Sequence, residues 1–89
     1  MMGTIDTSGL QQALATAEAA PTVREAAAAL RTQFAPLRVV VVDALDMRDE
    51  TPAAQGTRRS LYLGASDGHC WQVTSDLSHV AGLFIADRA

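Results

Sequence analysis

The chain has 89 residues, of which 48% are hydrophobic and 4% aromatic, so it fits one domain with a single, mainly aliphatic core. Its net charge of -3 at pH 7 argues against nucleic-acid binding, which uses a clustered basic surface. No apolar run reaches the length of about 20 residues that crosses a bilayer, and residues 1–10 lack the pattern of a secretion signal, so we expect a cytoplasmic protein without membrane contact.

The N-terminal third predicts two helices. Residues 1–7 lack periodicity and are expected to form a disordered leader. Ser8 and Gln11 then have the spacing of a capping box, which predicts a first helix that runs to about Ala19. Its apolar stripe is narrow and built mostly from small side chains: Leu10, Ala13, Leu14 and Ala17.

The second predicted helix has the stronger pattern. Thr22 and Glu25 repeat the capping-box spacing, and Pro36 cannot continue a helix. We therefore expect the helix to run from Val23 to about Phe34. One face of it is apolar and consists of Val23, Ala26, Ala27, Leu30 and Phe34.

The pattern changes from helical to extended after Pro36. Residues 37–45 form a β-branched run without polar alternation in its middle. This run predicts a strand that is covered on both faces, or one whose second face is apolar for another reason. Residues 46–57 are polar, show no apolar period and are expected to form a mobile loop.

The segment from residue 59 to residue 75 predicts a β-hairpin, because two short runs of strand-favouring residues flank Asp67-Gly68. A two-residue loop would pair Leu63 with Gln72 and leave neither face cleanly apolar. A three-residue loop would pair Leu63 with Trp71 and separate apolar from polar side chains, so we prefer it. In that register one face is formed by Leu61, Leu63, Trp71 and Val73.

The remaining residues complete the predicted fold. Residues 76–81 suggest a single helical turn, and Leu83 to Ala86 suggest a last strand. Helices followed by strands imply an α+β domain of order α-α-β-β-β-β, with the two N-terminal helices packed on one face of a four-stranded antiparallel sheet. Residues 1–89 then form one domain without internal repeats.

The predicted helices cover only one face of that sheet. The preferred register places Tyr62 on the other face, together with Cys70 opposite Gly64. An apolar patch of this kind marks an interface, and two-fold dimers are the commonest oligomers. We therefore expect a non-enzymatic interaction or accessory domain that forms a homodimer or binds a protein partner, although the first helix could instead cover this face. The candidate partner-binding residues are Tyr62, Cys70, Val40, Val42 and Phe84.

A second hypothesis is a small-ligand or metal-binding site at the acidic junction from Asp43 to Glu50. Asp43 and Asp46 would supply oxygen atoms, and Arg58 and Arg59 would bind a phosphate or carboxylate. The stretch lacks the ligand spacing and turn glycine of a calcium loop, so a solvated loop is the simpler interpretation. We assign no metal site and no cofactor.

His69 and Cys70 carry the most reactive side chains, but consecutive residues of a strand point to opposite faces. His79 lies on the order of 20 Å from His69, at about 3.3 Å per residue of strand. We therefore expect no catalytic residue and no enzyme activity. The single cysteine cannot form an internal disulfide, which fits a reducing cytoplasm.

Several short segments resemble one family of proteins. They are Phe34-Ala35-Pro36-Leu37 with the valine-rich run after it, Leu61-Tyr62-Leu63, Asp67-Gly68-His69-Cys70, Thr74-Ser75-Asp76 and Ala81-Gly82-Leu83. Together they are similar to a family of small bacterial proteins of unknown function, some of whose members are encoded beside nitrogen-fixation genes. The resemblance covers the C-terminal two thirds and implies an α+β fold. Family members carry a more acidic segment after the first strand, whereas here Ala44 and Leu45 separate Asp43 from Asp46, which argues against carrying over a metal role.

Overall fold

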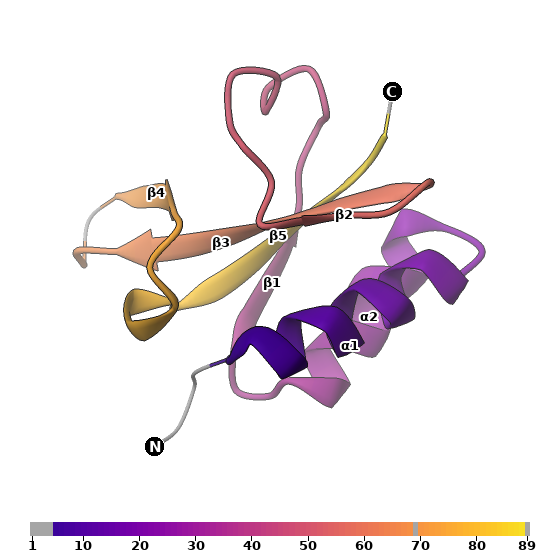
Figure 1. Cartoon of the computed structure of the whole chain (residues 1–89), viewed down its shortest axis with the longest axis horizontal. Helices are drawn as coiled ribbons and strands as arrows, with labels where there is room; N and C mark the ends of the chain where they lie inside the picture. Colours follow the sequence, from indigo (N-terminus) through magenta and orange to yellow (C-terminus); the bar gives the residue numbers. More distant parts are fainter. Residues whose placement is uncertain (1–4, 69, 89) are drawn as a thin grey trace.

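The computed structural model describes residues 5–68 and 70–88, so residues 1–4 of the predicted leader and His69 lie outside the described residues. Two helices cover one face of a sheet, and a long loop rises from the opposite face (Figure 1). No described helix is long and apolar enough to cross a bilayer. The elements are α1 (Thr7–Ala19), α2 (Val23–Gln33), β1 (Arg38–Val41), β2 (Ala54–Gln55), β3 (Arg59–Ser66), β4 (Trp71–Thr74), the 3-10 turn η1 (Leu77–His79) and β5 (Gly82–Asp87).

The sheet is mixed. β5 lies in its interior, parallel to β1 and antiparallel to β3. The opposite edge of β3 is shared by two short strands, β2 along its first half and β4 along its second half. The α+β class is thus confirmed, whereas the prediction of four strands in a purely antiparallel sheet was wrong.

The additional strand lies in the segment that was predicted as a loop. Ala54 pairs with Leu61 and Gln55 with Ser60, so this segment contains the short strand β2. The chain between β1 and β2 passes over the sheet from one side to the other, and β1 pairs with the last strand, β5, rather than with the next one (Figure 1).

The helix starts follow from local side-chain hydrogen bonds. Thr22 caps α2 as predicted, because its hydroxyl accepts the N–H of Glu25 at 3.1 Å and its own proton points to the Glu25 carboxylate at 3.3 Å. The cap of α1 was predicted wrongly at Ser8. Asp6 provides it instead, since its carboxylate accepts the N–H of Gly9 at 2.7 Å.

The main core lies between the helices and the sheet. Helix α2 contacts β1 and β5, while α1 contacts β2 and β3, so both helices lie on the same face. Small residues such as Ala13, Ala17, Ala26 and Ala27 are fully buried and allow the helices to approach each other closely. The largest fully buried side chains are Leu30, Leu61, Leu63, Leu83 and Ile85.

The hairpin formed by β3 and β4 is confirmed, but both registers considered for it were wrong. Leu63 pairs with Thr74, and Gly64 pairs with Val73 instead of lying opposite Cys70. Since residues directly opposite each other share a face, Val73 and Trp71 lie on the face away from the helices. The prediction that Trp71 shares a face with Leu61 and Leu63 was therefore wrong.

A longer loop than predicted causes the shift in register. The Asp67 carboxylate accepts the N–H of Cys70 at 2.9 Å, and the ladder begins at the pair of Ser66 and Trp71, so four residues (67–70) lie between the strands instead of the predicted three. Gly68 adopts a φ of 97°, a conformation that residues with a side chain rarely adopt.

Candidate functional site

The sheet face that points away from the helices carries a band of apolar side chains, which we call the second sheet face. Val40, Phe84 and Tyr62 form one row across β1, β5 and β3, because they are directly paired. Trp71 and Val73 extend the band on β4. The second sheet face thus consists of Val40, Val42, Tyr62, Trp71, Val73 and Phe84.

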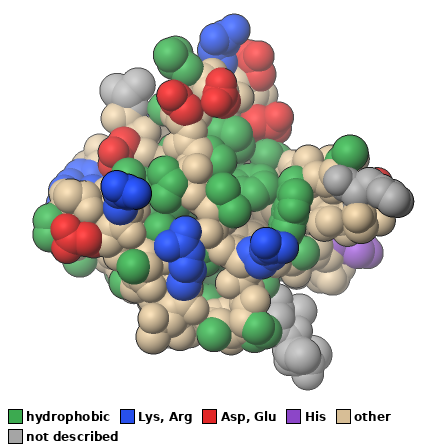
Figure 2. Space-filling model, turned by 180° about the vertical axis from the view of Figure 1, so that it is seen from behind, with side chains coloured by type: hydrophobic (Ala, Val, Ile, Leu, Met, Phe, Trp, Pro, Cys, Tyr) green, Lys and Arg blue, Asp and Glu red, His purple; other side chains and the backbone are tan. Residues whose placement is uncertain are grey.

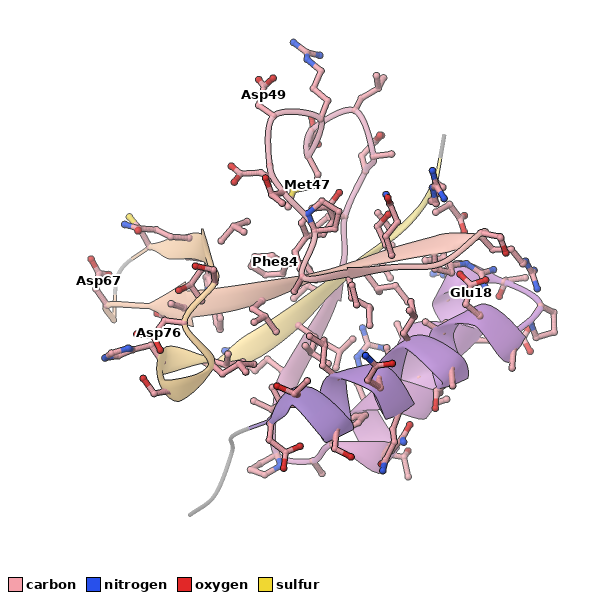
Figure 3. All side chains as sticks on the ribbon, in the orientation of Figure 1. Glu18, Met47, Asp49, Asp67, Asp76 and Phe84 are labelled. Carbon is pink, nitrogen blue, oxygen red and sulfur yellow. The ribbon has the colours of Figure 1, made fainter. Side chains whose placement is uncertain are left out.

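The long loop covers part of this face. Met47 is buried against Tyr62 and Ala86, and Phe84 packs on the same cluster from its partly buried position. Figure 3 shows Met47 on the side of the loop that is near the sheet, on the same side of the sheet as Phe84. The rest of the band stays accessible, since Val40 is 42% exposed and Trp71 is 40% exposed.

The Trp71 ring lies close to two glycines. Gly64 and Gly82 are paired across β3 and β5. A Cβ placed on either glycine would lie 3.2 Å from the Trp71 ring, so any larger residue there would have to displace the ring. The ring also meets Phe84 edge to face, with centroids 5.9 Å apart and an angle of 67° between the planes. Trp71 is therefore held in position although much of it faces solvent.

The candidate partner-binding residues lie partly where they were predicted. Tyr62 is buried at 6% exposure and contributes to the floor of the second sheet face. Val42 and Phe84 are half-buried, and Val40 and Cys70 are exposed. Cys70 precedes β4 in the hairpin loop. The sequence reasoning missed Trp71, because the assumed loop length placed its ring on the opposite face.

Arg58 and Arg59 lie at the C-terminal end of α1. The Arg58 guanidinium donates to the carbonyls of Glu18 and Pro21 at 3.0 and 3.2 Å. Arg59 is only 3% exposed and donates to the carbonyls of Ala17 and Ala20 at 2.7 and 3.0 Å. Such side chains satisfy helix carbonyls that have no partner within the helix.

Glu18 fixes the same corner from the helix side. Its carboxylate accepts the backbone N–H groups of Arg58 and Arg59, the shortest at 2.7 Å, and the hydroxyl of Thr57 at 3.0 Å. Partial burial acts to raise the pKa of Glu18, but the hydrogen bonds from these three residues outweigh it and hold the pKa below its usual value.

The acidic junction forms turns in the long loop. The Asp43 carboxylate accepts the N–H of Leu45 at 2.9 Å, and the backbone of Asp46 donates to the Asp43 carbonyl at 3.0 Å. Asp49 lies at the outer end of the loop (Figure 3). In residues 5–68 and 70–88, no three His, Cys, Asp or Glu side chains are grouped as potential metal ligands.

A cleft opens between this loop and the hairpin. It has a volume of about 400 Å³ and lies where β2 and β4 leave a gap along β3. Loop residues 49–53 form one wall, and the opposite wall includes Thr74, Ser75 and Leu77. Leu63 and Val73 contribute an apolar lining.

Ser78, His79 and Asp76 are close together but do not form a catalytic triad. Asp76 caps the turn η1 by accepting the N–H and hydroxyl of Ser78 at 3.0 and 2.6 Å. Both the Ser78 hydroxyl and the Asp76 carboxylate contact Nδ1 of His79. In a catalytic triad the acid contacts one ring nitrogen of the histidine and the nucleophile contacts the other. Hydrogen bonds from the Ser78 and His79 side chains lower the pKa of Asp76 to about 2.

Comparisons with known proteins add no relative, since no family model, curated protein or solved structure matches the chain.

Proposed function

We propose that the protein is a non-enzymatic interaction domain that self-associates through the second sheet face. The observation that supports this proposal is the exposed band beside Phe84, where Val40 and Trp71 share the sheet face that points away from the helices. Apolar side chains gathered on one surface favour association, because the contact removes them from water.

A second copy of the chain is the occupant we propose. Two-fold dimers are the commonest oligomers, and an aromatic side chain held in a fixed position loses little conformational freedom on binding. Trp71 meets this condition because Gly64, Gly82 and Phe84 restrict its ring.

Sedimentation velocity over a range of concentrations tests the proposal. We expect the wild type to dimerise and the double variant Trp71→Ser, Val40→Ser to remain monomeric. Leu45→Ser is the matched control, because Leu45 is 66% exposed but lies in the loop after β1, and this variant should dimerise like the wild type. A wild type that stays monomeric at high concentration would remove the basis of the proposal.

The single tryptophan provides a second readout. Burial of Trp71 in a dimer should shift its fluorescence emission to shorter wavelength as the concentration rises. An emission spectrum that stays constant while the protein dimerises would locate the interface elsewhere.

A small-ligand or metal-binding role of the region from Asp43 to Glu50, with Arg58 and Arg59, is the second proposal. The cleft of about 400 Å³ beside Asp49 and Glu50 favours a ligand role, whereas both arginines already donate to carbonyls of α1 or the residues after it. Titration of labelled protein with divalent metals and anionic metabolites, followed by amide shifts, tests it. The absence of localised shifts around residues 43–53 would oppose this role.

A further inference from the structure

The open edge of β1 is the feature that the proposed function leaves unused. β1 pairs with β5 on one side only and ends the sheet. In a parallel ladder, alternate residues direct both their N–H and C=O toward the same neighbour. The N–H of Val42 donates to the carbonyl of Ile85 at 2.9 Å, so Val40 and Val42 face β5. Val39 and Val41 consequently direct their backbone groups to the open side.

A groove runs along this edge between β1 and α2. It has a volume of about 490 Å³ and is lined by Arg24, Ala27, Arg31, Val39, Val40 and Val41. The side chains of Val40 and Val41 are 42% and 39% exposed. An accessible strand edge beside such a groove can accept a further strand, which gains main-chain hydrogen bonds as well as side-chain contacts.

The groove is basic although the whole chain is acidic. Arg24 and Arg31 line it, Arg38 begins the strand, and none of the described residues that line it is acidic. Among the described residues, the side chains of Arg24 and Arg38 have no hydrogen-bond or ion-pair partner. Seen from behind, the molecule shows basic side chains in a row next to a hydrophobic band, with the acidic residues gathered mainly above them (Figure 2).

Arg31 covers one of the exposed acceptors. Its Nε and Nη2 atoms donate to the carbonyl of Val39 at 3.2 and 3.0 Å. The N–H and C=O of Val41 and the N–H of Val39 remain for an incoming strand. Arg31 thus both occupies part of the edge and supplies a positive charge beside it.

We propose that the open edge of β1 binds an extended acidic segment of a partner protein, which adds a strand to the sheet. Its backbone pairs with Val39 and Val41, and its carboxylates meet Arg24 and Arg31. A second copy of β1 is a poor occupant, because two-fold pairing would bring the arginines of both copies together. The proposal does not require dimerisation through the second sheet face, although Val40 belongs to both surfaces.

Selection from a displayed library of short random peptides tests this proposal, because it does not require the partner to be identified first. The bait is the wild-type protein, and the counter-bait is Val41→Pro, which removes an N–H from the open side only. We expect enrichment of acidic peptides that do not bind the counter-bait. Circular dichroism of Val41→Pro checks that it is folded, and Val41→Thr is the control that keeps the N–H.

Charge and register are tested on a synthetic copy of an enriched peptide. The double variant Arg24→Glu, Arg31→Glu should weaken its binding about tenfold, because the two attractive contacts of the groove become repulsive. Binding should slow hydrogen exchange at the amides of Val39 and Val41 and leave that of Val40 unchanged. Enriched peptides without acidic residues, equal binding to folded Val41→Pro, or protection confined to other strands would each overturn the proposal.

Discussion

Arg59 holds the end of α1 against the sheet, and its replacement by methionine should destabilise the fold strongly. The side chain is 3% exposed and donates to the carbonyls of Ala17 and Ala20 and to Asp87 at 2.6 Å. Each lost hydrogen bond to a charged group costs about 1.5–3 kcal/mol. Asp87 is 60% exposed, so solvent screens that contact, and it adds only about 0.5 kcal/mol. With two helix-end carbonyls losing their donor and the small contribution of Asp87, we expect Arg59→Met to reduce the free energy of unfolding by about 3.5–6.5 kcal/mol.

Equilibrium unfolding in urea, followed by circular dichroism, measures this loss. Asp87→Asn is the matched control, because it removes the charge of the exposed partner and leaves both helix carbonyls satisfied. We expect it to cost less than about 1 kcal/mol. Arg59→Lys should fall between the two, because an ammonium group cannot reproduce the geometry of the guanidinium. Equal losses for Arg59→Met and Asp87→Asn would refute the assignment of most of the energy to the helix end.

Three further predictions concern other parts of the fold. Gly82→Ala places a Cβ 2.8 Å from the Arg38 carbonyl, so β1 and β5 must move apart. We expect this to lower the free energy of unfolding by about 1–3 kcal/mol and to shift Trp71 emission to longer wavelength. An unchanged melting temperature and emission spectrum would contradict this prediction. Because the pKa of Asp76 is lowered, its contribution to stability is complete above pH 3.8 and is lost as the pH falls to about 2. The NMR signal of its carboxyl carbon should therefore titrate with a midpoint near 2. A midpoint at 3.8 would contradict the capping geometry. Thr22→Ala should cost about 1 kcal/mol in thermal unfolding and Thr22→Ser much less, so equal losses would show that the cap hydroxyl contributes nothing.

Local signals in the sequence predicted the helices and the hairpin well. Thr22 and Glu25 form the expected cap, since both side chains act within one turn. The hairpin register failed because the side chain of Asp67 binds the N–H of Cys70 and lengthens the loop. Leu63 pairs with Thr74 instead of Trp71, and a shift by an odd number of residues moves Trp71 to the other face. The apolar pattern alone did not reveal this shift.

Long-range pairing was beyond the reach of sequence patterns. The parallel pair of β1 and β5 joins Arg38 to Gly82, residues separated by 82 − 38 = 44 positions. No local signal specifies such a contact, and the same holds for the role of Arg59 at the end of α1. The candidate surface was therefore predicted as a face, through Tyr62 and Phe84, but its most exposed ring was not.

The interior position of β5 has a consequence for synthesis of the chain. β1 and β3 leave the ribosome before the strand that joins them, so the sheet cannot be completed until Gly82 to Asp87 have been made. A nascent chain that pauses earlier exposes strand edges on both sides of the gap that β5 will fill. Folding then has to wait for closure over a long distance, and the unfinished chain is most prone to aggregation at this stage.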